Sequence, residues 1–543
     1  MKIYFFGALL LCAFTMESSE LSMRINKKYI NFPISHSVDR KQLQMSIDGE
    51  IIDKFQIRLS NKNIDYWVYR DVSEYMGKEI CFNYESDKKI PIFQSDTIVG
   101  HSSLYSELNR PQFHYTSKRG WMNDPNGLVY LNGEYHLFYQ HNPYEREWGN
   151  MSWGHAVSKD LLHWEELDIA LRPDEFGTMF SGSAVVDYNN TSGFGTKENP
   201  PLVAIYTADS REKQVQCLAY SLDSGRTWMK YENNPVIDSH EMWNSHDTRD
   251  PKVFWYSPNN HWVMILHERD GHSIYTSSNL KDWIYRSHIT GFWECPEFFP
   301  LSVDGMPGYE KWVMLGASGC YMLGDFNGYE FIPETGKHYY LAGNKAYAAQ
   351  TFNNIPEADG RRIQMSWGRI QHPDMPFRSM MSFPTELTLR KTKDGVRLFN
   401  CPIRELDNIQ HLIVEHPDTL TGMQANDILK EISNLETFRL KAIITLSHST
   451  SAGLKLGKQT ILNYDIGYSK VNDTFYSPEK FTSMSISVDV LVDRTSVEIF
   501  VDNGALTCML QRTSQEKEPQ KITFWGNRIA VSNLELYKIE SIW

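Results

Sequence analysis

Three acidic residues stand in short stretches whose composition indicates a reactive site. Asp124 lies in Trp-Met-Asn-Asp-Pro-Asn-Gly (121–127), Asp250 in Arg-Asp-Pro (249–251) and Glu294 in Trp-Glu-Cys-Pro (293–296). Each stretch alone is a weak signal, because Asp-Pro-Asn-Gly is also a good β-turn. Together they offer the two carboxyl groups that hydrolysis of a glycosidic bond requires, one on each side of the bond. A third carboxylate beside an arginine can hold substrate hydroxyls.

The elements that must bring these acids together are predicted to be the blades of a β-propeller. Between residues 112 and 398, strands recur that end in a Ser-x-Asp or Asn-Gly turn followed by an aromatic residue. The marks lie at 158–164, 221–228, 278–283 and 325–329. Their spacing suits four-stranded blades of roughly 40 residues or more. With a closing stretch at 347–388 they predict a five-bladed β-propeller, whose inner strands converge on a central channel.

The fold class is predicted to be all-β, with one further domain on each side of the propeller. Residues 412–543 alternate in polarity and predict a C-terminal β-sandwich with strands at 438–446, 485–491 and 496–501. Residues 20–105 predict a small N-terminal β accessory domain, because β-prone stretches are separated there by polar turns and no acidic cluster suggests chemistry.

The first residues predict export from the cytoplasm. Met1 and Lys2 precede an apolar run from Ile3 to Phe14, and polar residues follow, which is typical of a signal peptide over residues 1–19. The protein is therefore expected to be secreted or periplasmic. A lipid anchor on Cys12, giving a cell-surface protein, is the alternative. No later segment is apolar enough to predict a transmembrane helix.

Composition excludes several other classes of partner. The net charge is −13 and no long run of Lys or Arg occurs, so nucleic acid is not expected. Aromatic residues make up 13% of the chain, which suits a carbohydrate partner. We predict no cofactor and no metal, because no His/Asp cluster or Cys pair has ligand spacing. The six cysteines beyond Cys12 are scattered and predict buried free thiols. Protein partners are left open.

The stretches taken together resemble glycoside hydrolase family 32, the β-fructosidase family of invertases, inulinases and levanases. The resemblance covers residues 112–543 and includes Val-Asp-Arg-Thr-Ser-Val-Glu-Ile-Phe (492–500), which is similar to the family's C-terminal signature. Propeller families that cut arabinans share three acids but would not carry both tryptophan-containing stretches. The region before the propeller resembles the extra N-terminal module of some fructan-degrading enzymes of gut Bacteroidetes, which favours a polysaccharide substrate.

The resemblance assigns roles to the three acids. It implies that Asp124 is the nucleophile, Asp250 the transition-state stabiliser and Glu294 the acid/base. The residues that it implies hold the terminal fructose are Trp121, Asn123, Gln140, Trp148, Phe180, Ser181, Arg249 and Trp367. From sequence adjacency we also expect Arg249 to keep the Asp250 carboxylate charged.

The function implied is retaining hydrolysis of terminal β-D-fructofuranosidic bonds in levan, inulin or sucrose, with exo-action. Two alternatives use the same motifs. A fructosyltransferase would pass the same covalent intermediate to a sugar instead of water, and a non-catalytic propeller would bind fructan without cutting it.

Overall fold

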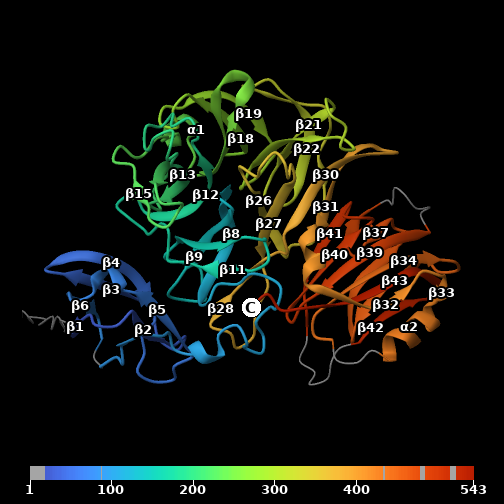
Figure 1. Ribbon diagram of the computed structural model, residues 1–543, viewed down its shortest axis with the longest axis horizontal. Helices are drawn as coiled ribbons and strands as arrows, with labels where there is room; N and C mark the ends of the chain where they lie inside the picture. Colours follow the sequence, from blue (N-terminus) through green and yellow to red (C-terminus); the bar gives the residue numbers. More distant parts are fainter. Residues whose placement is uncertain (1–18, 87–88, 432–434, 477–483, 514–520) are drawn as a thin grey trace, which may run out of the picture. The chain divides into compact units, whose positions relative to one another are not determined.

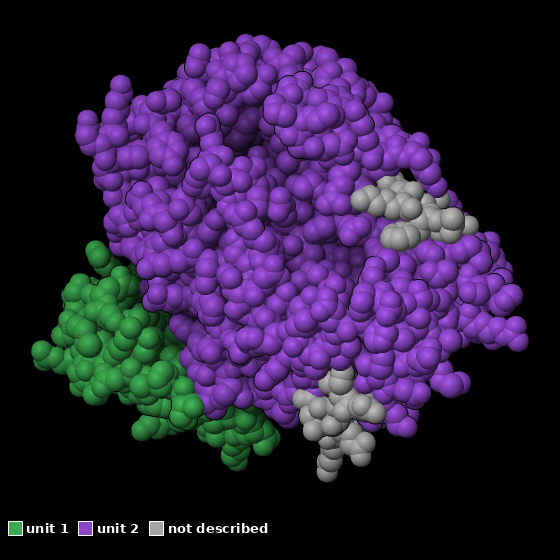
Figure 2. All heavy atoms as spheres, turned by 45° about the vertical axis from the view of Figure 1, so that its right-hand side comes forward, with its two compact units in different colours: residues 1–102 green, residues 103–543 purple. Residues whose placement is uncertain are grey.

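The computed structural model describes residues 19–86, 89–431, 435–476, 484–513 and 521–543 (Figure 1). Residues 1–18 of the expected signal peptide, Cys12 among them, lie outside the described residues. The chain divides into two compact units, residues 1–102 and 103–543, coloured separately in Figure 2. Helical structure in the described residues is limited to the short α1 (His240–Trp243), α2 (Gly422–Glu431) and four 3-10 turns, η1 (Ser73–Tyr75), η2 (His101–Ser103), η3 (Ser257–Asn259) and η4 (Arg404–Asn408).

The first unit contains two antiparallel sheets. Their strands, in spatial order, are β1 (Ser19–Arg24), β6 (Glu79–Tyr84), β3 (Lys41–Ile47) and β4 (Glu50–Ile57), and then β5 (Tyr66–Asp71), β2 (Tyr29–Ile34) and β7 (Phe93–Ser95). Alternate residues of β3 and β5 are buried, as the period of two demands, whereas β2 is buried from Ile30 to Ile34. Phe32 of β2 meets Phe55 of β4 edge to face at 6.1 Å, so apolar side chains of the two sheets pack against each other.

Five sheets of the second unit form the blades of a propeller (Figure 1). From the inner strand outward they are β8 (Gly120–Leu131), β9 (Glu134–Asn142), β10 (Ser152–Ser158) and β11 (Trp164–Glu166); β12 (Thr178–Val186), β13 (Leu202–Asp209), β14 (Gln214–Ser221) and β15 (Met229–Lys230); β16 (Thr248–Tyr256), β17 (His261–Glu268), β18 (Gly271–Ser277) and β19 (Ile284–Thr290); β20 (Glu297–Ser302), β21 (Glu310–Leu315), β22 (Cys320–Phe326) and β23 (Phe331–Pro333); and β26 (Ala346–Thr351), β27 (Arg362–Gly368), β30 (Thr385–Thr392) and β31 (Gly395–Pro402). Short strands β24 (His338–Tyr339), β28 (Phe377–Arg378) and β29 (Met380–Met381) pair with β22, β8 and β27.

The inner strands are irregular at similar positions. Register shifts occur at Met122/Pro125 in β8, Met179/Gly182 in β12, Arg249/Lys252 in β16 and Tyr347/Gln350 in β26. A bulge bends a strand and re-aims its side chains. These bulges therefore turn side chains of four blades toward the central channel near one end of their inner strands.

Below these bulges, side chains of the last blade fasten the inner strands to one another. Gln350 accepts from the Leu128 N–H of the first blade at 2.8 Å and donates to the Gly182 carbonyl of the second at 3.0 Å. Asn353 donates to the carbonyls of Ala184 and Val253, on the second and third blades, at 2.9 and 3.0 Å. These bonds satisfy buried peptide groups that strand pairing leaves unpaired.

A buried ion pair crosses the same level of the channel. Lys252 of the third blade lies 2.9 Å from the Glu297 carboxylate of the fourth and donates to the Thr351 carbonyl of the fifth at 2.8 Å. Both charged side chains are almost fully buried. The channel is therefore filled by hydrogen-bonded side chains at this depth.

The remainder of the second unit is a β-sandwich, so the expected propeller followed by a sandwich is confirmed. One sheet has the order β25 (Leu341–Ala342), β41 (Leu506–Gln511), β40 (Ser496–Val501), β39 (Ser485–Val492), β34 (Phe438–Leu446), β43 (Ile529–Ile539) and β32 (Gln410–His416), with β33 (Leu420–Thr421) beside β43. The other has the order β38 (Thr474–Phe475), β37 (Lys470–Val471), β36 (Gln459–Asp465), β35 (Ser451–Leu456) and β42 (Ile522–Gly526). A core of Leu, Ile and Val from both sheets fills the space between them.

The signature at 492–500 fastens the sandwich to the chain that leads into the propeller. Asp493 accepts from the N–H groups of Gln112 and Phe113, at 2.8 and 3.1 Å. His114 lies between Asp493 and Glu498, with ring nitrogens 2.7 and 3.1 Å from their carboxylates. Burial opposes a charge on His114, but the two carboxylates outweigh it and raise the pKa of this imidazole to about 9. His114 is therefore an imidazolium in the folded protein near neutral pH.

We predict that His114→Gln destabilises the protein by about 3–5 kcal/mol at pH 6, because it leaves two buried carboxylates without their cation. The stabilisation from a raised histidine pKa is fully present below the unfolded value of about 6.5 and is lost as the pH rises through about 9. Thermal or urea unfolding at pH 6 and pH 9.5 should therefore show a smaller difference at the higher pH.

The exposed pair of His163 with Asp160 provides the control, since an ion pair in water contributes about 0–1 kcal/mol. A His114→Gln effect no larger than that of His163→Gln would contradict the role given to the buried cluster.

Candidate active site

Three blades bring their acids to one end of the channel. Asp124 lies at the bulge of β8, Asp250 at the bulge of β16 and Glu294 in the turn that precedes β20. Asp250, Glu294 and Cys295 have φ angles of 65°, 48° and 41°. Such left-handed conformations are unfavourable for residues with a side chain and are found where the surrounding structure holds them in place, often at functional sites.

Asp124 accepts from neutral donors. The Ser181 hydroxyl donates to its Oδ2 at 2.8 Å, and the Cys295 sulfur lies 3.7 Å from the same oxygen. Burial raises the pKa of Asp124, and the negative charge of Glu294 adds to the effect. Hydrogen bonds from Ser181 and Asn123 act in the opposite direction and favour the carboxylate.

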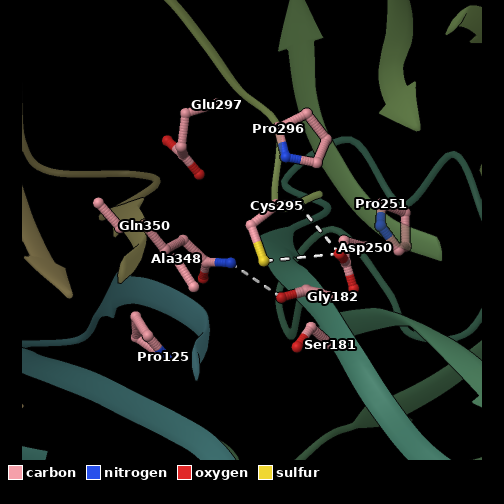
Figure 3. A pocket seen from close by; sticks show the side chains of 11 residues that line it. Pro125, Ser181, Gly182, Asp250, Pro251, Cys295, Pro296, Glu297, Ala348 and Gln350 are labelled. Carbon is pink, nitrogen blue, oxygen red and sulfur yellow. Dashed lines mark hydrogen bonds between the residues drawn. The ribbon is translucent and has the colours of Figure 1, made fainter. Parts of the chain in front are cut away.

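Asp250 is buried and tied to the segment that carries Glu294. Its Oδ2 accepts from the Cys295 backbone N–H at 3.0 Å, and the Cys295 sulfur lies 3.5 Å away (Figure 3). Burial, together with the charges of Asp124 and Glu294, outweighs the opposing charge of Arg249 and raises the pKa of Asp250 to about 7. Arg249 therefore acts in the expected direction but does not hold the pKa of this carboxyl at its ordinary value.

The reason is where the Arg249 guanidinium points. Its Nε is 3.9 Å from Asp250, whereas its terminal nitrogens bond to Asp247 and, at 2.8 Å, to Glu294. Its charged group also lies 5.6 Å from the centre of the Trp293 ring. Arg249 therefore pairs with Asp247, two residues earlier, and with Glu294 of another blade more closely than with Asp250.

Glu294 has a partner on each carboxylate oxygen. Arg249 donates to Oε1, and the Tyr347 hydroxyl donates to Oε2 at 2.6 Å. The side chain is one-quarter exposed, so it can meet a ligand that enters from solvent. Glu294 is thus the most open of a cluster whose other acids lie deeper.

The thiol of Cys295 fills the space between Asp124 and Asp250. Burial and the surrounding carboxylates hold its pKa well above the ordinary value, so it stays neutral. The six cysteines of the described chain are free thiols, as expected from the sequence, and Cys217, Cys320 and Cys508 are buried. The pocket at this level is lined by Pro125, Ser181, Gly182, Asp250, Pro251, Cys295, Pro296, Glu297, Ala348, Ala349 and Gln350.

Two predicted ligand residues are linked to each other beside Asp124. The Trp121 indole donates to Asn123 at 2.8 Å, and its ring meets Trp367 edge to face at 5.9 Å. Trp367 Nε1 is buried without a hydrogen-bond partner in the described chain. Gln140 is buried beside Asn126, whose amide accepts from both Gln140 nitrogens at 3.0 Å when its oxygen faces them.

Trp148 and Phe180 form an aromatic edge further out. Their rings meet edge to face at 6.0 Å, and Trp148 is 51% exposed. Half of a large apolar ring facing water is available for a ligand. The predicted binding residues thus range from buried Asn123, Gln140, Ser181 and Arg249, through half-buried Trp121, Phe180 and Trp367, to exposed Trp148.

The sequence prediction missed Tyr347, Arg369 and Trp293. Trp293 precedes Glu294 and is 49% exposed. The Arg369 guanidinium lies over the rings of Tyr347 and Trp367, at 4.0 and 4.5 Å. Trp293 belongs to the Trp-Glu-Cys-Pro motif (293–296), so the sequence did offer a signal for it. Nothing in the residues around Tyr347 distinguishes it from a tyrosine of the core.

The described chain contains neither a potential metal-binding cluster nor a potential membrane-spanning helix. No group of three or more His, Cys, Asp or Glu residues within it could hold a metal ion. Nor does it contain a helix long and apolar enough to cross a membrane.

Known proteins match most of this chain. A family model for the glycosyl hydrolases family 32 N-terminal domain matches residues 114–402. A levanase of Bacillus subtilis (strain 168) is 40% identical over 492 residues, covering 81% of this chain and 72% of the levanase. An extracellular exo-inulinase of Aspergillus ficuum is 32% identical over 529 residues, covering 82% and 97%. The crystal structure of exo-inulinase from Aspergillus awamori matches with a TM-score of 0.69 and 29% identity, covering 81% of this chain and all of that one.

We predict that Asp250→Asn stabilises the protein in a pH-dependent way. A carboxylate whose pKa rises to about 7 on folding opposes folding above its unfolded value of about 3.9, and the penalty is complete above pH 7. The variant should therefore match the wild type near pH 4 and gain roughly 2–4 kcal/mol by pH 8.

Urea unfolding across this range measures the effect. Asp325→Asn is the control, because Asp325 is exposed and pairs with Lys311 at the surface. A stability difference for Asp250→Asn that does not grow with pH would refute the electrostatic account.

Proposed function

Because the chain belongs to glycosyl hydrolase family 32, we propose that it hydrolyses β-D-fructofuranosidic bonds with retention of configuration. Asp124 is the nucleophile, Glu294 the acid/base and Asp250 the stabilising group. The observation that carries this assignment is that residues from three blades are joined through Cys295 and Arg249 into one cluster. Levanase and exo-inulinase are the names of its relatives, which supports a fructan as substrate.

The first chemical step suits the environments of Glu294 and Asp124. Glu294 gives its proton to the glycosidic oxygen, which leaves with the electron pair of the broken bond. Asp124 forms a bond to the anomeric carbon and gives a covalent fructosyl ester. Ser181 and Asn123 favour the ionised form that attack requires.

In the second step the same groups act in reverse. The Glu294 carboxylate takes a proton from water, the water oxygen bonds to the anomeric carbon, and Asp124 leaves as a carboxylate. Asp250, adjacent to both, accepts hydrogen bonds from fructose hydroxyls and strengthens them as positive charge develops on the ring.

Binding of a single terminal fructose follows from the depth of the site. The channel below the acids is filled by the Lys252–Glu297 pair and the side chains of Gln350 and Asn353. A chain that reaches Asp124 must therefore end there. This geometry supports exo-action on levan, inulin or sucrose, with Trp121, Trp148 and Trp367 against the sugar and Gln140, Phe180 and Arg249 completing the pocket.

Residues 20–105 form, in this proposal, an accessory domain in addition to the propeller domain (112–398) and the sandwich domain (412–543). Export follows from the signal peptide and agrees with the extracellular exo-inulinase among the relatives. Amino-terminal sequencing of the mature protein checks where the leader ends and whether Cys12 is retained with a lipid.

Azide distinguishes the nucleophile from the acid/base. We predict that Asp124→Ala lowers kcat by about 10⁴-fold or more and that Glu294→Ala lowers it by about 10²–10⁴-fold. With an activated β-fructoside, azide attacks the covalent intermediate in Glu294→Ala and gives a β-fructosyl azide. In Asp124→Ala azide replaces the nucleophile and gives the α product, which NMR identifies.

The surface variant Asp325→Asn is the control and should retain wild-type turnover. Opposite anomers from the two site variants would exchange the roles of Asp124 and Glu294. Fructan binding without turnover by the wild type would favour the non-catalytic propeller.

Product analysis tests exo-action. We predict that digests of inulin and levan contain free fructose from the first time points, because the filled channel admits only a chain end. Chromatography by chain length measures this. An early ladder of oligosaccharides would contradict the dead-ended pocket, and products longer than the substrate at high sucrose would indicate the transferase alternative.

A further inference from the structure

Tyr347 donates a hydrogen bond from an uncharged group to Glu294, the proposed acid/base. Its hydroxyl donates to Glu294 Oε2 at 2.6 Å, while Arg249 donates to Oε1 at 2.8 Å. A guanidinium is charged and has no acceptor, so it opposes a proton on Oε1 more strongly than the neutral Tyr347 hydroxyl, which can also accept, opposes one on Oε2. The proton that Glu294 gives to a leaving group therefore sits on Oε2, the oxygen that Tyr347 contacts.

The bulge of β26 and the side chain of Arg369 hold Tyr347 in this position. The residue lies at the bulge of β26, next to Ala348, whose φ is 52°. The Ala348 N–H donates to the Ala317 carbonyl of the fourth blade at 2.9 Å, which anchors the bulge. Arg369 lies over the Tyr347 ring at 4.0 Å, and the Arg369 N–H donates to the Lys345 carbonyl at 2.7 Å.

A cation over the ring makes the phenol a stronger donor. The guanidinium withdraws electron density from the hydroxyl, and a strong donor favours the ionised form of the carboxylate that it contacts. Burial and the adjacent Glu294 carboxylate keep the pKa of Tyr347 well above its ordinary value. Tyr347 therefore stays a neutral donor and does not transfer its own proton.

We propose that Tyr347 is a positioning residue that stabilises the Glu294 carboxylate left after a proton departs from Oε2, the oxygen that Arg249 does not contact. The inference rests on the proposed function. In the first step the Oε2 proton moves to the glycosidic oxygen as the bond to the anomeric carbon breaks, and the Tyr347 O–H bond strengthens on the new carboxylate. In the second step the carboxylate takes a proton from water while Tyr347 remains the donor.

Other charged or titratable groups also face Glu294, and their contributions must be held constant. They come from every element packed around it: Asp124 from β8, Asp247, Arg249 and Asp250 at β16, His267 from β17, neighbouring Cys295, and Arg369 after β27. Burial lowers the pKa of His267 to about 4, so its charge does not change near neutral pH. A substitution limited to the Tyr347 hydroxyl leaves all of them in place.

The variant Tyr347→Phe removes only that hydroxyl. Losing a hydrogen bond to a charged acceptor should move the alkaline limb of the kcat/KM profile upward by about 1 pH unit. The rate with sucrose or inulin should fall by about 10-fold, because a weaker acid protonates a poor leaving group less readily. A β-fructoside with a 4-nitrophenyl leaving group needs little protonation and should keep its rate of fructosyl transfer to Asp124.

Tyr340→Phe is the matched control, because the Tyr340 hydroxyl is buried and donates to the neutral Gln364 amide at 3.1 Å. Its pH profile should equal that of the wild type. An unchanged alkaline limb and an unchanged ratio of the two substrates in Tyr347→Phe would overturn the inference while leaving the proposed function intact. Failure of the azide experiment would instead remove the proposed function itself.

A second substitution covers the case in which Tyr347→Phe does not fold. Site-specific 3-fluorotyrosine at position 347 keeps the side chain and makes its hydroxyl a stronger donor. The alkaline limb should then move to lower pH, in the direction opposite to that of Tyr347→Phe. An alkaline limb at the wild-type position would overturn the proposal.

Discussion

Three carboxyl groups crowd one end of the propeller channel, and among the described residues only the Arg249 guanidinium bonds directly to any of them. This excess of negative charge explains several local features. The Cys295 backbone N–H and the Ser181 hydroxyl supply hydrogen bonds without adding charge. Arg249 bonds to Glu294, and Asp250 holds its proton to about pH 7. Three ionised carboxylates in this site would repel one another. The acids therefore share a small number of protons.

Holding such a site requires rigidity elsewhere. The left-handed backbone at Asp250, Glu294 and Cys295 persists because β16, which carries Asp250, and β20, which follows Glu294 and Cys295, are fixed below them. Gln350, Asn353 and the Lys252–Glu297 pair supply that fixation with bonds that cross blade boundaries. The same side chains that fasten the blades also close the channel, so the stability of the ring and the shape of the pocket have one origin.

Much of this architecture could be predicted from the sequence. Alternating polarity gave strands 438–446 and 496–501 with the bounds that the structure has, and the recurring turns gave the five blades. The three acids were predicted because their motifs occur together and resemble those of a known family. Arg249 and Asp250 show why adjacency misleads: successive residues of a strand face opposite sides, and a bulge changes the direction again. Tyr347 and Arg369 could not be found, because their role arises from contacts between blades that no local pattern records.

The buried cluster of His114, Asp493 and Glu498 has a consequence for how the protein folds during its synthesis. His114 and Asp493 are separated by 379 positions in the chain, and the ring that lies between them closes only when β28 reaches β8. The ribosome synthesises Asp124, in the first blade, long before the other blades of the propeller. Contacts of such long range form late and slowly. The nascent chain therefore has no finished pocket around Asp124 until the fifth blade has emerged, and the contact of His114 with Asp493 forms only after the last domain has been made.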